Sequence, residues 1–130
     1  MMYITSPDKR IVDSYNNLKF ILNEEDINRY IMYGPYDVFD KGNYQFSFQF
    51  ENISFVNKDA PCLKLEVYSN EEGMLAETTV NQNDLQKMGK PIDFEVFLNS
   101  TGSLEFRVMP LCRGEIVFSE ITFRKTHIIN

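Results

Sequence analysis

Hydrophobic and polar residues alternate along much of this chain with the two-residue period of a β-strand. The clearest run is NYQFSFQFE at 43–51, where every second residue is aromatic and the residues between are glutamine or serine. Strict alternation of this kind predicts a strand with one buried face. The runs CLKLEVYS (62–69), IDFEVFL (92–98) and SLEFRVM (103–109) repeat the pattern.

Shorter apolar runs predict further strands at 18–22, 29–34, 36–39, 74–80 and 115–125. In the last of these, EIVFSEITFRK, the apolar positions change register in the middle, so we expect a β-bulge at Ser119–Glu120. Only 81–91 has helical character, and Gly89 and Pro91 limit it to one or two short helical turns. About eight or nine short strands with almost no helix predict an all-β fold, a jelly-roll-type antiparallel β-sandwich.

The chain length of 130 residues fits one domain with a core of its own. We expect an N-terminal arm at 1–16, the sandwich at 17–125 and a tail at 126–130. The formal net charge of −6 argues against nucleic acid or an anionic membrane as a partner. Without an apolar run typical of a signal peptide or a membrane span, we expect a cytoplasmic protein, with Cys62 and Cys112 as free thiols rather than a disulfide.

The residue types needed for several common chemistries are absent from the sequence. Its one histidine, His127, argues against a histidine-based triad or a multi-histidine metal site, and no glycine-rich phosphate loop occurs. We therefore expect no catalytic residue, no metal and no cofactor. The alternative is a glycan-active enzyme that uses the carboxylates of Asp93 and Glu95. Two carboxyl groups that face each other across a sugar can hydrolyse its glycosidic bond.

The polar residues of the alternating strands mark candidate ligand contacts. Gln45 and Gln49 share one strand face, Tyr68 lies on another, and Glu105 and Arg107 lie on a third. They form either a solvated sheet exterior or a groove in which polar groups bind sugar hydroxyls and an aromatic ring stacks on the sugar. Tyr33, in the Tyr-Gly-Pro-Tyr corner, either braces the corner or lines the groove, and Arg113 is a loop candidate.

Several of these segments together resemble a group of bacterial accessory domains. The resemblance lies in YGPYDVFDKGNYQFSFQFE, LKLEVYS, SLEFRV and EIVFSEITFRK, and it extends from about Leu18 to Lys125. The group consists of carbohydrate-binding-module-like β-sandwiches associated with glycosyltransferases and methyltransferases that build surface polysaccharides. The resemblance implies a non-catalytic module that binds or positions a glycan or polysaccharide, with an associated glycosyltransferase or methyltransferase as a partner.

Two other functions fit the same strand pattern. A β-sandwich can serve as a protein-interaction domain, which binds another protein or forms a homodimer, or it can serve as a small glycan-active enzyme. An exposed apolar patch that includes Tyr30, Phe97 or Met109 would favour the interaction domain. Two facing, desolvated carboxylates in a cleft would favour the enzyme.

Overall fold

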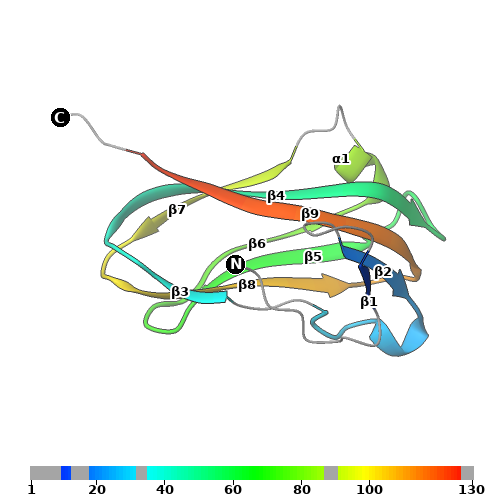
Figure 1. Ribbon diagram of the computed structural model, residues 1–130, viewed down its shortest axis with the longest axis horizontal. Coiled ribbons are helices and arrows are strands. Elements are labelled where there is room, and N and C mark those ends of the chain that lie inside the picture. Colours follow the sequence, from blue (N-terminus) through cyan, green and yellow to red (C-terminus); the bar gives the residue numbers. More distant parts are fainter. Residues whose placement is uncertain (1–9, 13–17, 32–34, 87–90, 127–130) are drawn as a thin grey trace.

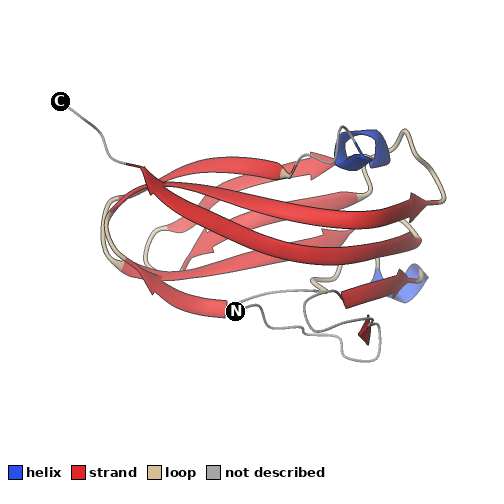
Figure 2. Ribbon diagram, turned by 45° about the horizontal axis from the view of Figure 1, so that its top comes forward, coloured by secondary structure: helices blue, strands red, loops and turns tan. Residues whose placement is uncertain are grey.

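The computed structural model describes residues 10–12, 18–31, 35–86 and 91–126. Within these residues two short helices, η2 (Glu24–Asp26) and α1 (Gln82–Gln86), lie at the same end of the molecule (Figures 1 and 2). The strands are β1 (Arg10–Val12), β2 (Leu18–Leu22), β3 (Pro35–Phe39), β4 (Gly42–Phe55), β5 (Leu63–Ser69), β6 (Gly73–Val80), β7 (Ile92–Leu98), β8 (Gly102–Pro110) and β9 (Gly114–Thr126).

The strands form two antiparallel sheets packed face to face, as the sequence predicted. The five-stranded sheet has the order β1-β2-β9-β4-β7, and the four-stranded sheet has the order β3-β8-β5-β6. In Figure 1, β4, β7 and β9 form the upper layer and β5, β6 and β8 the lower one. From β2 to β9 the chain changes sheet at every connection except the β5–β6 hairpin. This connectivity makes the fold a jelly-roll-type β-sandwich.

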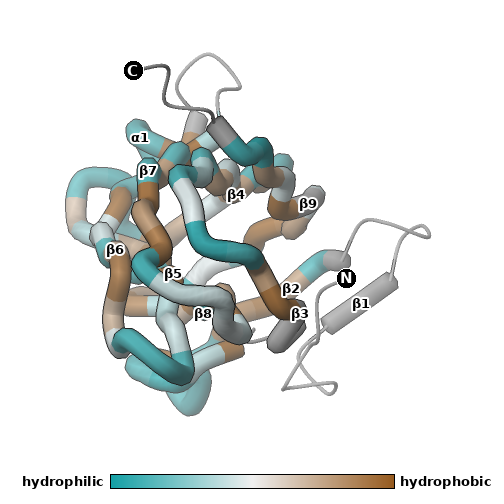
Figure 3. Tube along the Cα trace, turned by 90° about the vertical axis from the view of Figure 1, so that its left-hand side faces the viewer, coloured by the Kyte–Doolittle hydropathy of each residue, from teal (hydrophilic) through white to brown (hydrophobic). Residues whose placement is uncertain are grey.

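The core lies between the sheets and is built from the apolar positions of the alternating strands. Phe46 and Phe48 from β4 and Leu65 from β5 are fully buried, and Phe106 from β8 is nearly so. The Phe46 and Phe106 rings meet edge to face with their centroids 4.9 Å apart. Figure 3 shows polar and apolar residues alternating along the strands. Each buried ring of this kind stabilises the fold by about 1.5–3 kcal/mol.

The change of register in the last strand is a β-bulge, as predicted. Glu120 pairs with Gln49, but the next residue of β4, Phe50, pairs with Phe118, so Ser119 has no partner of its own on β4. The extra residue keeps the apolar side chains of both halves of β9 on the inner face. Ile116 and Phe118 are buried in the first half, and Ile121 packs against the core in the second.

The segment before β3 differs from the prediction of a strand at 29–34. Residues 27–28 form a turn, bends follow at Arg29 and Ile31, and 32–34 lie outside the described residues. The segment still follows β8, because Asn28 N–H donates to Pro110 O at 2.9 Å and Ile31 N–H donates to Val108 O at 2.9 Å. Asn28 has a positive φ of 65°. That left-handed residue interrupts the extended backbone that a strand would need.

The predicted helical turn and thiols are present in the structure. Helix α1 lies within 81–91, and Asp84 N–H donates to Asn81 Oδ1 at 2.9 Å at its start. Cys62 and Cys112 are free, Cys62 buried and Cys112 half-buried. Two elements were not predicted: η2, and β1, which falls within the expected N-terminal arm. No helix among the described residues is long and apolar enough to span a membrane.

Candidate functional site

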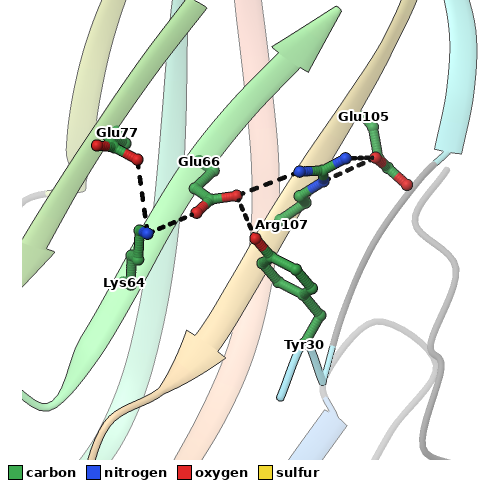
Figure 4. Close-up of polar contacts among 6 residues, drawn as sticks. All are labelled: Tyr30, Lys64, Glu66, Glu77, Glu105 and Arg107. Atoms are coloured by element: carbon green, nitrogen blue, oxygen red, sulfur yellow. Dashed lines mark hydrogen bonds and ion pairs between the residues drawn. The ribbon is translucent and has the colours of Figure 1, made fainter. Parts of the chain in front are cut away.

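The outer face of the four-stranded sheet carries a cluster of charged and aromatic side chains. The register of β5 and β8 places Glu66 opposite Arg107 and Tyr68 opposite Glu105. The adjacent strand β6 places Glu77 opposite Glu66 on its other side. Figure 4 shows Glu66 at the centre of the resulting contacts. We call Tyr30, Lys64, Glu66, Tyr68, Glu105 and Arg107 the outer-face cluster.

Glu66 is the unusual member, because its side chain is fully buried although it points away from the core. Its Oε1 accepts a hydrogen bond from the Tyr30 hydroxyl at 2.8 Å and lies 3.5 Å from Arg107 Nη1. Its Oε2 lies 3.1 Å from Lys64 Nζ, but in the described part of the chain it accepts no hydrogen bond. Burying an ionised carboxylate costs free energy unless the carboxylate is paired, so these contacts offset the cost of burying Glu66.

Arg107 connects the glutamates to the aromatic rings. Its Nε donates to Glu105 Oε2 at 2.7 Å, and its Nη2 contacts the same oxygen. The guanidinium carbon lies 4.1 Å from the centre of the Tyr68 ring and 5.2 Å from that of Tyr30. A guanidinium held by a carboxylate and placed over rings is fixed in position and orientation. The contacts within the cluster therefore fix the position of the guanidinium.

Tyr30 reaches the cluster from the segment before β3 rather than from a strand. The backbone bonds of Asn28 and Ile31 to β8 hold this segment along the sheet edge. A turn at Asn23–Asp26 supports it, since Asn23 N–H donates to the Asp26 carboxylate at 2.8 Å. The sequence pattern indicates Tyr30 only as a member of an exposed apolar patch. Its partner Glu66 lies far along the chain, so no local pattern could have identified the pair.

The contacts of the cluster shift the pKa of Tyr30 and the pKa of Lys64 in the same direction. Burial, together with the hydrogen bond to Glu66, raises the pKa of Tyr30 above its usual 10.0. The contact with Glu66 and the charges of Glu66 and Glu77 raise the pKa of Lys64 above its usual 10.5. Both shifts favour the protonated side chain. At neutral pH the cluster thus presents a tyrosine hydroxyl and an ammonium group beside a carboxylate.

The structure divides the predicted ligand contacts between the two sheets. Tyr68, Glu105 and Arg107 belong to the outer-face cluster, whereas Gln45 and Gln49 lie on the outer face of the five-stranded sheet. These two groups are therefore on opposite sides of the sandwich. Arg113 is exposed in the turn between β8 and β9, and Tyr33 lies outside the described residues.

The outer face of the five-stranded sheet carries a smaller polar group. Asp93 accepts hydrogen bonds from Ser47 Oγ at 2.6 Å and from Gln45 Nε2 at 3.3 Å. Asp93 and Glu95 are both exposed. Their exposure differs from the facing, desolvated pair of carboxyl groups that the enzyme alternative needs. In residues 10–12, 18–31, 35–86 and 91–126, no group of three or more histidine, cysteine or acidic side chains is arranged to hold a metal ion.

Comparison with known proteins gives a clear answer at the level of fold. No protein-family model matches the chain, and no curated protein matches its sequence. A chain of the accessory secretory protein 1, 2 and 3 structure from Streptococcus pneumoniae superposes with a TM-score of 0.61, at 11% identity over 95% of both chains.

Two carbohydrate-binding modules also superpose on the domain. The C-terminal CBM6 module of the laminarinase LamC from Zobellia galactanivorans gives a TM-score of 0.55 at 16% identity, covering 96% of this chain and 87% of the module. A CBM6 module of lichenase 5A from Cellvibrio mixtus, solved with cellotriose, gives 0.52 at 12% identity, covering 97% and 88%. The fold is therefore that of the carbohydrate-binding-module β-sandwiches, as the sequence resemblance predicted.

Proposed function

We propose that this domain is a non-catalytic carbohydrate-binding module and that it binds its glycan on the outer-face cluster. The observation that carries the proposal is the fully buried carboxylate of Glu66, whose Oε2 is paired with the half-buried ammonium group of Lys64 at 3.1 Å. A carboxylate oxygen of this kind is a strong acceptor for a sugar hydroxyl once the Lys64 side chain moves away. The guanidinium of Arg107 covers one face of the Tyr68 ring, so a sugar would stack on the other face.

In this proposal, binding displaces the side chain of Lys64 from the Glu66 carboxylate. Lys64 covers Oε2, and about a third of its side chain is exposed, so its long aliphatic stem can swing toward solvent. A sugar placed over Tyr68 would then offer one hydroxyl to Glu66 and others to Lys64 Nζ. Arg107 stays in place through Glu105, so it orients the ring of Tyr68 rather than the sugar.

We further propose that the glycan belongs to bacterial surface-polysaccharide assembly in the cytoplasm, with a glycosyltransferase or methyltransferase as partner. The sequence resemblance to accessory domains of such enzymes supports this context. The fold shared with a chain of the accessory secretory protein structure is consistent with an accessory role. The fold shared with a module solved with cellotriose supports the carbohydrate ligand.

The test is a glycan-array screen of the purified domain, followed by calorimetric titration of the best glycan. Tyr68→Ala should weaken binding at least about tenfold, because a stacked ring contributes on the order of 1–3 kcal/mol. Gln49→Ala is the matched control, since Gln49 lies on the other outer face, and it should leave affinity unchanged. Weakening by Gln49→Ala but not by Tyr68→Ala would move the site to the five-stranded sheet. No binding to any glycan would refute the proposal.

A protein-interaction domain is the second candidate. Phe97, one of the residues expected to mark an apolar patch, is 47% exposed at the edge strand β7. Met109 and Tyr30 are only half-buried members of the other sheet's outer face, so the three residues do not form one patch. A second copy or another chain that co-purifies with the domain, in the absence of glycan binding, would favour this function.

A further inference from the structure

We propose that the group which the glycan offers to Glu66 is a protonated amine, so that the ligand is a glycan with a free amino group. This inference rests on the proposed function and specifies the ligand of the same site. Lys64 Nζ lies 3.1 Å from Glu66 Oε2, with 32% of the Lys64 side chain exposed and 1% of the Glu66 side chain. The ammonium group of the ligand would replace that of Lys64 on this oxygen.

Lys64 supplies much of the positive charge that compensates the buried carboxylate of Glu66. Arg107 also contacts Glu66, but its Nη1 lies 3.5 Å from Oε1, whereas its Nε donates to Glu105 Oε2 at 2.7 Å. The hydroxyl of Tyr30 donates to Glu66 Oε1 at 2.8 Å and brings no positive charge. Figure 4 shows these contacts on one carboxylate oxygen and Lys64 on the other. Removing the Lys64 ammonium group without a substitute would therefore leave a poorly compensated buried charge.

The cost of losing this charge distinguishes the groups that a sugar can offer to Glu66. A hydroxyl or an acetamide N–H can donate a hydrogen bond to Oε2, but neither restores the lost positive charge. A protonated primary amine does both, and hydrogen bonds to charged groups are roughly twice as strong as neutral ones. A quaternary ammonium group has no N–H to donate, and a sugar carboxylate would be repelled by Glu66. The primary amine is therefore the group that fits the site.

Lys64 has a second carboxylate that can hold it after displacement. Its Nζ lies 3.6 Å from Glu77 Oε2, and the Glu77 side chain is 53% exposed. The strand register places Glu77 opposite Glu66 across β5 and β6. The flexible stem of Lys64 can therefore swing toward Glu77 and solvent while its ammonium group keeps an ion pair.

The ammonium group of the ligand would also complete the pairing of charges around Lys64. The carboxylates of Glu66 and Glu77 share the ammonium group of Lys64. With the ligand on Glu66 and Lys64 on Glu77, each of these carboxylates would have a cation beside it. A sugar carboxylate, sulfate or phosphate would instead add a further negative charge next to them. The site should therefore reject acidic glycans.

The experiment is calorimetric titration of the full chain with glucose oligosaccharides in three matched forms, at a pH at which the amine is protonated. The forms carry a hydroxyl, an amine or an acetamide at carbon 2 of each sugar. The amine form should bind at least about tenfold more tightly than the other two, because it alone replaces the charge of Lys64.

Two glutamate variants show whether the preference for the amine form comes from the site. Glu66→Gln removes the charge but keeps an oxygen acceptor, so it should weaken binding of the amine form at least about tenfold and abolish the preference. Glu51→Gln is the matched control, because it removes one negative charge at an exposed position of the five-stranded sheet. It should change the affinity by less than about twofold.

A lysine variant tests the displacement itself. Lys64→Met removes the competing ammonium group, so it should bind the amine form at least about threefold more tightly than the unchanged chain does. Lys58→Met makes the same charge change at an exposed position outside the outer-face cluster and should leave the affinity unchanged. Thermal unfolding checks that both variants fold. At equal concentration, the amine form should raise the Tm of Lys64→Met more than that of the unchanged chain.

The outcomes separate this inference from the proposed function. Equal binding of the three forms, weakened by Tyr68→Ala, would overturn the inference and leave the proposed function intact. A preference for the amine form that survives Glu66→Gln, or that Glu51→Gln reduces equally, would assign the preference to the overall negative charge of the chain and overturn the inference. Binding of none of the three forms would also overturn it, and the glycan-array screen would then decide separately whether the domain binds another carbohydrate.

Discussion

The hydrogen bond between Tyr30 and Glu66 can be tested by removing one hydroxyl group. Tyr30→Phe deletes the donor that contacts Glu66 Oε1 at 2.8 Å but keeps the ring over Arg107, so it leaves no large cavity. A hydrogen bond to a charged group contributes roughly 1.5–3 kcal/mol. Since Arg107 and Lys64 still pair with Glu66, we expect a loss near the lower end, about 2 kcal/mol.

The assay is urea unfolding of four proteins: the unchanged chain, Tyr30→Phe, Glu66→Leu and the double variant. The double-mutant cycle should give a coupling free energy of about 1–2 kcal/mol, because each single change removes one partner of the bond, the hydroxyl donor or the carboxylate acceptor. In thermal unfolding, Tyr30→Phe should lower Tm by roughly 5–8 °C. Tyr68→Phe is the matched control: its hydroxyl has no hydrogen-bond partner in the described part of the chain, so a change within about 0.5 kcal/mol is expected.

Two results would refute this reasoning. A coupling free energy near zero would mean that the hydroxyl and the carboxylate do not interact in solution. Equal destabilisation by Tyr30→Phe and Tyr68→Phe would mean that the loss comes from packing of tyrosines in general. Either result would mean that the Tyr30 hydroxyl is not the hydrogen-bond donor that stabilises the buried carboxylate of Glu66.

Three further predictions follow from other features. Because the pKa of Tyr30 is raised above 10.0 in the folded protein, the contribution of Tyr30 to the free energy of unfolding should be fully present below about pH 10 and be lost as pH rises through the folded pKa. Denaturant titrations of the unchanged chain and of Tyr30→Phe should show this, because the difference between them should shrink over this range. Burial raises the pKa of the Cys62 thiol to about 12, so Cys62 should react slowly with an alkylating reagent at mildly alkaline pH. Mass spectrometry should show that half-buried Cys112 is modified well before Cys62. Equal rates of modification would contradict this prediction. Gly114→Ala should lower the free energy of unfolding by roughly 2–4 kcal/mol, because a Cβ would lie 2.5 Å from Ser54 O and 2.8 Å from Phe55 Cα. Gly73 has a φ of +89° and open space around it, so Gly73→Ala should cost only about 1–2 kcal/mol. Urea unfolding of the two variants measures both losses.

The candidate site was only partly accessible from the sequence. Alternation correctly placed Tyr68, Glu105 and Arg107 on outward faces, and the register now brings them together. The same alternation placed Gln45 outward too, but on the opposite sheet. The alternation of polar and apolar residues distinguishes the inner from the outer face of a strand, but it carries no information on which sheet the strand joins. That choice depends on pairing between strands distant in the chain.

The sequence by itself determined the fold class, because alternation and turn residues act over a few neighbouring positions. It also located the bulge in β9, since a change of register must be absorbed within the strand that carries it. Only the tertiary structure decided that Glu66, an outward residue by pattern, is fully buried. Its burial comes from Tyr30, Lys64 and Arg107, which three separate segments bring to one point. Burial depends on all the neighbours in space, and these are set by the packing of the whole chain.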